Sequence, residues 1–296
     1  MLLRELALGE KNVSELVQST GMSQPNVSNH LSRLRERGLV TSDRRGRQIV
    51  YRLASSGIAH LMLMHGEPGA GAPPDPTVIA ERFLEAVLTL REEEPARLVD
   101  SALAAGLEWR DLYLRVFVPA LTRIGDMWER SELSVADEHL ITGIILRLLH
   151  RLSLALPPAP QHLAASALVG CVEGELHTVG GRMVADFLLS RGWRVWYLNG
   201  FLPLEHLMEG VKRHLPNAVV LCVSTEACQE HLVTTVARIQ RWRGEQPLPL
   251  IVAGGRYFTS HPPAAGVDLC GTDIEAVTEE MDRRVTAIRG AADLSN

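Results

Sequence analysis

An imidazole and a carboxylate that could form a metal site lie two residues apart in the stretch 171–181, which reads CVEGELHTVGG. The pattern is Glu175-x-His177-x-x-Gly180. Histidine is the commonest metal ligand in proteins, and a second group usually holds its other ring N–H. The pattern therefore indicates a candidate ligand site, although a solvated histidine in a surface loop would have the same local sequence.

This stretch lies between a strand pattern and a helix pattern. The apolar run at 166–170 precedes it and is typical of a buried parallel strand. Apolar residues at helical spacing follow it, namely Met183, Val184, Phe187 and Leu188. We therefore expect His177 to lie in a loop between a strand and a helix.

Two later strand patterns also end in residues suited to a ligand. The strand at 218–223 is followed by Ser224-Thr225, and the strand at 248–253 is followed by Gly254-Gly255. Ligands of open α/β sheets bind at the carboxyl ends of the strands, near the point where the strand order reverses. The three strand ends are therefore expected to form one binding edge.

Together these motifs resemble the cobalamin-binding domains of methionine-synthase and mutase type. The resemblance implies that His177 ligates cobalt from below, displaces the cofactor's own dimethylbenzimidazole, and is oriented by Glu175. It also implies that the displaced nucleotide tail passes into the sheet. The residues expected around the tail are Gly180, Ser224, Thr225, Gly254 and Gly255.

The segment 161–292 alternates strand and helix patterns, which predicts a doubly wound, flavodoxin-like parallel sheet. The expected strands lie near 166–172, 194–198, 218–223, 248–253 and 267–270. No G-x-G-x-x-G fingerprint and no P-loop is present in the sequence.

Residues 77–156 show only helical periodicity and predict a four-helix bundle. The expected helices span 78–93, 96–105, 111–129 and 135–154. Pro119 is expected to kink the third helix, and Ser134 to cap the fourth, with Asp137 in its first turn.

Trp128 and the pair Glu138-His139 resemble the helical cap of CarH-type, light-dependent cobalamin repressors. The resemblance implies that the indole lies over the upper face of cobalamin and that the pair lines the upper-ligand pocket. Some of these photoreceptors carry a histidine directly after the tryptophan, where this chain has Glu129. An interhelical tryptophan with a solvated Glu-His pair is the alternative.

Residues 1–64 predict three helices followed by a hairpin. Asn12 and Glu15 form a capping pair, a turn follows at 20–22, and Val27, Leu31 and Leu34 supply the apolar face of the third helix. The runs SQPNVSNHLSRLRERGLV and DRRGRQIVYRL resemble the winged helix-turn-helix of ArsR-type repressors. The segment has no cysteine, so we do not expect it to sense metals in the manner of that family.

This head carries nine basic and five acidic residues between positions 1 and 56, although the whole chain has a net charge of −5. A basic head on an acidic body predicts an anionic partner for the head. Short polar groups suited to base edges lie on the third helix: Gln24, Asn26, Ser28, Asn29 and His30. Arginines suited to phosphates are Arg33, Arg44, Arg45 and Arg47.

The chain of 296 residues is long enough for about two domains, or for three small ones. We expect a linker at 65–76 and a proline hinge at 157–160. No apolar run approaches the roughly 18 residues of a membrane span, and the N-terminus opens on a helix pattern rather than a signal peptide. Four cysteines near strands are expected to be reduced, and the protein to be cytoplasmic.

The sequence thus predicts a DNA-binding transcriptional regulator, a repressor controlled by adenosylcobalamin and sensitive to green light, and no enzymatic activity. The expected partners are double-stranded operator DNA and further copies of the chain, as a dimer or tetramer. Two alternatives remain open: a corrinoid protein of a methyltransferase system, and a cobalamin sensor that does not respond to light.

Overall fold

The computed structural model forms two compact units, 1–157 and 158–296. The residues that it describes are 2–7, 9–36, 39–45, 48–54, 73–156 and 165–293. The predicted hinge at 157–160 and most of the predicted linker lie outside these residues. No helix within the described ranges is long and apolar enough to cross a membrane.

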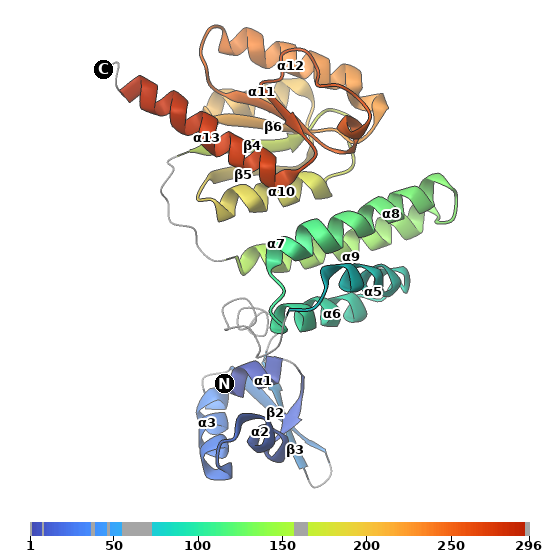
Figure 1. Ribbon diagram of the computed structural model, residues 1–296, viewed down its shortest axis with the longest axis vertical. Coiled ribbons are helices and arrows are strands. Elements are labelled where there is room, and N and C mark those ends of the chain that lie inside the picture. The colour runs from blue at the N-terminus through green and yellow to red at the C-terminus, as the bar shows by residue number, and fades with distance from the viewer. Residues whose placement is uncertain are drawn as a thin grey trace. The chain divides into compact units, whose positions relative to one another are not determined.

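The N-terminal head is a winged helix, with three helices packed on a small antiparallel sheet of order β1-β3-β2 (Figure 1). Its elements are α1 Leu2–Ala7, β1 Lys11–Asn12, α2 Val13–Thr20, α3 Gln24–Glu36, β2 Val40–Arg45 and β3 Gln48–Leu53. The predicted capping box at the start of α2 is confirmed, because Asn12 and Glu15 each bond the other's backbone N–H. Val27 and Leu31 are fully buried, as the helical spacing predicts.

The predicted hairpin is present, formed by β2 and β3. Its first strand, β2, continues to Arg45, which pairs with Gln48 of β3. Arg44 and Arg45 are therefore on the strand and not in the turn. The two residues of β1 are too few to give an alternating pattern, and only their pairing with Val50 and Tyr51 defines them as a strand.

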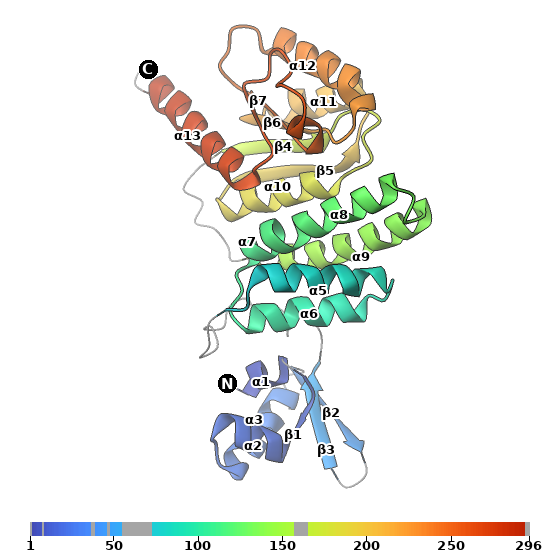
Figure 2. The ribbon, with the colours of Figure 1, turned by 45° about the vertical axis from the view of Figure 1, so that its right-hand side comes forward.

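Residues 73–156 form the helical bundle (Figure 2). Its elements are α5 Pro76–Leu88, α6 Glu93–Ala104, α7 Trp109–Asp111, a π-helix Leu112–Phe117, α8 Val118–Glu129 and α9 Val135–Leu154. The core contains Phe83, Tyr113 and Phe117, which contact one another through their rings and are fully buried. The capping box of Ser134 and Asp137 is confirmed, and α9 has the predicted bounds.

The first two helices differ from their predicted bounds. The first was expected to span 78–93, but α5 begins at Pro76, where Asp75 caps it, and ends at Leu88; Leu90 takes a left-handed φ of 58°. The second was expected to begin at residue 96, but α6 begins at Glu93. Pro119 lies in the first turn of α8, directly after the π-helix, where it has no N–H to donate to the preceding turn.

The C-terminal unit contains a five-stranded parallel sheet of order β5-β4-β6-β7-β8, and the predicted doubly wound, flavodoxin-like fold is confirmed (Figures 1 and 2). The strands are β4 Ser166–Cys171, β5 Arg194–Phe201, β6 Ala218–Cys222, β7 Leu250–Gly254 and β8 Leu269–Gly271. The main helices are α10 Val179–Ser190, α11 Leu204–His214, α12 Gln229–Arg243 and α13 Ile274–Asp293.

Two apolar cores cover the two faces of this sheet. Residues of α11 and α12 pack on one face, where Leu207, Val211 and Leu232 are buried. Residues of α10 and α13 pack on the other, where Leu188 and Met281 are buried. The strand order reverses between β4 and β6, so the carboxyl ends of these two strands mark the expected ligand-binding edge.

Candidate functional site

His177 and Glu175 are joined by two hydrogen bonds in the loop between β4 and α10. His177 Nδ1 lies 2.6 Å from Glu175 Oε1, and the backbone N–H of His177 donates to the same oxygen at 2.9 Å. An ionised carboxylate only accepts, so Nδ1 carries the proton of this bond. The His177 side chain is 55% exposed, whereas the Glu175 side chain is fully buried. This arrangement fixes the ring and leaves Nε2 as the ring nitrogen that could ligate a metal.

Glu175 also connects the ends of β4 and β6. Its Oε2 accepts the backbone N–H of Ser224 at 2.5 Å. Burial alone would raise the pKa of Glu175, but the hydrogen bonds from His177 and Ser224 outweigh it and lower this pKa below its ordinary value. These hydrogen bonds therefore stabilise the folded protein at pH values above the pKa that Glu175 has in the unfolded chain. This contribution is lost as the pH falls through the lower pKa of Glu175 in the folded state. Glu175 is therefore a carboxylate at neutral pH.

Glu175→Gln is expected to weaken cobalamin binding about 10–100-fold, as is typical for groups that orient a metal ligand. Both carboxylate oxygens accept hydrogen bonds, so an amide nitrogen in place of either would face an N–H donor. Glu173→Gln is the matched control, because Glu173 lies in the same loop and accepts only the N–H of Leu204 in the described structure, at 3.3 Å. Spectroscopic titration measures both, and equal affinities would contradict the role of Glu175.

The glycines at the start of α10 differ in their surroundings. A Cβ added at Gly180 would meet no atom within 4 Å, so this position borders open space. A Cβ added at Gly181 would lie 3.2 Å from Cys222 Sγ and 3.4 Å from the Tyr197 ring. Gly181, which was not selected from the sequence, allows α10 to lie close to β5 and β6.

Gly254 and Gly255 are needed by the chain's own packing. A Cβ would lie 2.9 Å from the Gly271 carbonyl oxygen at Gly254, and 2.2 Å from the Val223 carbonyl oxygen at Gly255. Gly255 also has a φ of 124°, which side chains rarely adopt. The sequence analysis expected these glycines to leave space for a ligand, but in the structure they bring the end of β7 against its neighbours.

Two predicted site residues follow β6. The hydroxyl of Thr225 donates to Cys228 Sγ at 3.3 Å. Within the described ranges the hydroxyl of Ser224 has no hydrogen-bond partner, and the residue is only half-buried. The ends of β4, β6 and β7 are neighbours in the sheet, so His177, Ser224 and Gly254 belong to one edge.

Exposed apolar side chains at this edge were missed by the sequence analysis. Leu176 is 69% exposed, although it lies between Glu175 and His177, and Phe201 at the end of β5 is 42% exposed. The register of β5 shifts between Tyr197 and Phe201, where β4 advances by only two residues. An apolar residue next to a candidate ligand is a usable signal in the sequence for Leu176, but the exposure of Phe201 depends on this bulge.

The predicted bundle residues come from α8 and α9. Trp128 is 45% exposed, which is high for an indole, and it lies near the end of α8. Glu138 Oε2 lies 2.8 Å from His139 Nδ1, and Thr142 donates to Glu138 Oε1 at 2.7 Å. The bundle and the sheet unit are separate bodies, so these contacts describe the bundle alone.

On the head, the polar residues predicted to read DNA are all exposed on one element, α3. They are Gln24, Asn26, Ser28, Asn29 and His30. Arg33 is also exposed on α3, and Arg44 is exposed on β2. Arg45 forms an exposed ion pair with Glu10 at 2.7 Å, and Arg47 lies outside the described residues.

Asn29→Ala is expected to relax base preference at one position of the bound DNA by about 1–3 kcal/mol, because asparagine can bond both edge groups of adenine. Arg33→Ala should instead weaken binding to all sequences and reduce the salt dependence by about one phosphate contact. Arg213→Ala on α11 is the control, since this arginine is exposed in the other unit. Binding measured over a salt series tests this, and equal salt slopes for the Arg33 and Arg213 variants would contradict the assignment.

The comparisons with known proteins agree with this combination of a winged helix and two ligand-binding units. Residues 1–42 match the family of bacterial regulatory proteins described as arsR. Residues 79–153 and residues 165–280 each match a family described as a B12 binding domain. The head of the chain is therefore similar to the arsR family, and the two later segments are similar to B12 binding domains.

Two similar relatives are the HTH-type transcriptional repressors CarH and CarA of Myxococcus xanthus. The chain is 30% identical to CarH over 197 residues, which are 65% of this chain and 64% of CarH. It is 27% identical to CarA over 181 residues, which are 61% of this chain and 59% of CarA. The chain thus spans about three fifths of the length of these relatives, and its resemblance to CarH-type regulators is confirmed.

A solved structure supports the fold of the last two segments. The monomethylamine corrinoid protein of Methanosarcina barkeri has a TM-score of 0.59 and 17% sequence identity to this chain. The match covers 70% of this chain and 98% of the corrinoid protein. At this identity the similarity establishes the fold alone.

Proposed function

We propose that this protein is a DNA-binding transcriptional regulator, acting as a repressor, whose DNA affinity is controlled by bound adenosylcobalamin. The observation that carries the proposal is the buried carboxylate of Glu175, which holds both the exposed ring of His177 and the backbone of Ser224 at the point of strand reversal. A winged helix in the same chain gives this ligand site a DNA-binding readout.

Several features of the sheet edge fit a corrinoid. His177 presents an exposed ring whose Nδ1 is held by Glu175, as a cobalt ligand through Nε2 requires. The space beside Gly180 and the hydroxyl of Ser224 suit the nucleotide tail. Leu176 and Phe201 offer apolar contacts to the lower face of the ring. The proposed lower site therefore uses residues from β4, β5 and β6 and the start of α10.

The proposed upper site uses the bundle. Trp128 supplies an exposed indole that can cover an adenosyl group, and Glu138 with His139 supplies polar groups beside it. The hydroxyl of Thr142 donates a hydrogen bond to the Glu138 carboxylate, and this bond fixes the orientation of the Glu138–His139 pair.

The proposal extends to light. When bound, adenosylcobalamin supplies a cobalt–carbon bond that green light cleaves. The chain's own contribution is to convert the loss of the adenosyl group into a new position of Trp128 and hence of the bundle. We expect the oligomer, a dimer or tetramer in darkness, to change with this movement, and the dimeric head to leave a pseudo-palindromic operator whose half-sites lie about 10 bp apart.

A spectroscopic and DNA-binding experiment tests the core of this proposal. Purified protein is titrated with adenosylcobalamin in darkness, and its affinity for duplex DNA selected from random sequence is measured with and without the cofactor. The proposal expects saturable cofactor binding and a DNA affinity that depends on it. Specific DNA binding that ignores saturating cofactor would overturn the regulatory function.

A corrinoid protein of a methyltransferase system is the second candidate, and its support is the fold shared with the monomethylamine corrinoid protein. Such a protein needs partners that donate and accept the methyl group, and it has no use for the exposed polar face of α3. Sequence-specific duplex binding therefore separates this candidate from the regulator. A regulator that responds to the cofactor equally in darkness and in light would be the light-independent sensor.

A further inference from the structure

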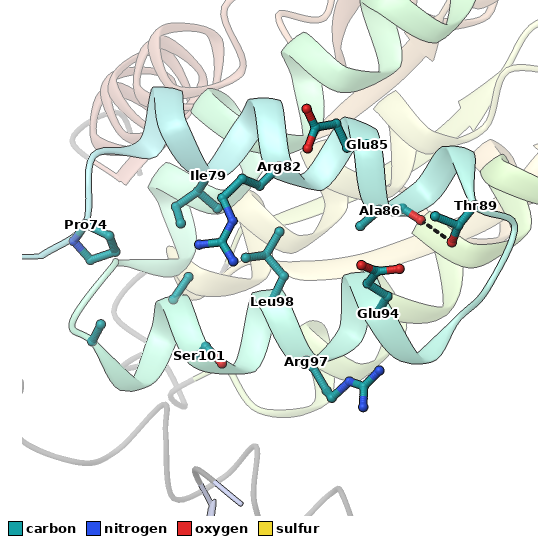
Figure 3. A pocket seen from close by; sticks show the side chains of 12 residues that line it. Pro74, Ile79, Arg82, Glu85, Ala86, Thr89, Glu94, Arg97, Leu98 and Ser101 are labelled. Atoms are coloured by element: carbon teal, nitrogen blue, oxygen red, sulfur yellow. Dashed lines mark hydrogen bonds between the residues drawn. The ribbon is translucent and has the colours of Figure 1, made fainter.

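A groove of about 600 Å³ lies between α5 and α6, on the first helical pair of the bundle (Figure 3). Ile79, Ala86, Leu98 and Ala102 supply its apolar floor. Figure 3 shows Arg82 extending from α5 into the space between the helices and Glu94 projecting into the same space from α6. The groove therefore has apolar walls and two charges of each sign, because Glu85 of α5 and Arg97 of α6 also line it.

Arg82 and Glu94 do not pair with each other. They lie at different positions along the groove, with Arg82 near Leu98 and Glu94 near Ala86 (Figure 3). Within the described residues neither forms an ion pair or a side-chain hydrogen bond. Four other arginines of the bundle do form ion pairs, namely Arg115, Arg130, Arg147 and Arg151.

Exposed apolar side chains occur at both ends of α5. Val78 is 51% exposed and lies one turn before Arg82 on the same face of the helix. Leu90 follows the helix, is exposed, and has a left-handed φ. Ser101 on α6 and Ala105 directly after it are small enough for another helix to approach closely. This face therefore has exposed apolar side chains beside a groove, which is typical of a surface that binds a partner.

We infer that the α5–α6 groove is an interface between two copies of this chain. A two-fold axis across the groove, midway between Arg82 and Glu94, reverses the direction of the groove in the second copy. Each Arg82 then lies opposite Glu94 of the other copy, and both unpaired charges acquire a partner. The same axis places Glu85 of each copy opposite Arg97 of the other. A surface whose opposite charges exchange places about such an axis is complementary to itself, which an isologous interface requires.

This inference names a surface for the homo-oligomer of the proposed function, but it needs neither DNA nor cobalamin. The face is one helical pair wide, and α5 with 13 residues is about 20 Å long. An interface of this size is at the small end of specific interfaces, so we expect reversible, weak association. The experiment is therefore performed on full-length protein without cofactor or DNA.

Sedimentation equilibrium over a concentration series measures the self-association of wild type, Arg82→Glu, Glu94→Arg and the double variant. Each single reversal replaces two opposite-charge contacts by two like-charge contacts, so we expect its dissociation constant to rise about 10–100-fold. The double variant exchanges the two charges and should associate nearly as well as wild type. Circular dichroism checks that all variants remain folded.

Arg123→Glu is the matched control, because Arg123 is an exposed arginine of α8 outside the groove, and no ion pair is formed by it in the described structure. It should associate like wild type. The inference is overturned if wild-type protein stays monomeric, if the Arg82 reversal has no more effect than the Arg123 reversal, or if the double variant is as weak as the single ones. Failure here with intact cofactor-dependent DNA binding would leave the proposed function standing.

Discussion

His177→Ala should bind adenosylcobalamin far more weakly than wild type, and by more than the roughly 10–100-fold expected for Glu175→Gln. The reason is that cobalt would lose its protein ligand, whereas Glu175 only orients that ligand. Any residual complex should lack the absorption spectrum of cobalamin with a nitrogen base below cobalt. Titration followed by absorption spectroscopy measures both effects.

His206→Ala is the matched control, because His206 is also an exposed histidine beside a glutamate, at 3.3 Å from Glu209. It lies on α11 and should bind the cofactor like wild type. Electron paramagnetic resonance of the cobalt(II) form adds a readout that a merely structural role would not affect. Labelling histidine with a heavier nitrogen isotope should alter the cobalt signal in wild type and in His206→Ala but not in His177→Ala. An unchanged spectrum and affinity in the His177 variant would remove the assignment.

The local parts of the fold could be predicted because short-range chemistry determines them. Asn12 with Glu15 and Ser134 with Asp137 are capping boxes in the sequence, and both form in the structure. The central strands β4, β6 and β7 follow from apolar runs that both faces bury. The end of α5 could not be predicted in this way, because Leu90 has no conformational preference for its left-handed φ.

The candidate lower site was predicted in its main pair but not in its full set of contacts. The spacing of Glu175 and His177 gives their hydrogen bond, since both lie in one short loop. The bond from Ser224 joins residues 49 positions apart, and only the pairing of β4 with β6 brings them together. The exposure of Phe201 likewise depends on the bulge in β5, which no local pattern indicates.

The roles of the glycines show the same limit. Gly254 and Gly255 fit an empty space when the sequence is considered alone, but the structure places a backbone carbonyl against each. The groove of the bundle is a further example, because the charges of Arg82 and Glu94 resemble any solvated pair until their separation along two packed helices is known. The roles of these glycines and of these charged residues depend on contacts between elements that are distant in the sequence.

Trp128→Ala should retain cobalamin binding and photolysis but lose much of the difference in DNA affinity between darkness and light. The Trp128 indole is 45% exposed, and stacking a base on an aromatic ring contributes about 1–3 kcal/mol. Shifting a two-state equilibrium from 1:99 to 99:1 needs about 5.5 kcal/mol of differential affinity. Stacking on Trp128 would therefore supply a substantial part of this differential affinity, and its loss should reduce the light response about 10-fold or more.

Leu154→Ala is the control for this variant, because Leu154 is an exposed apolar residue of α9 far along the helix from Glu138. It should respond to green light like wild type. Size-exclusion chromatography and DNA-shift experiments in darkness and after full photolysis measure the response. If Trp128→Ala keeps the wild-type response, the indole does not couple the adenosyl group to the head. If wild-type protein gives identical profiles before and after photolysis, loss of the adenosyl group does not act as a switch. A ligand can shift an equilibrium between two conformations only by its differential affinity for them.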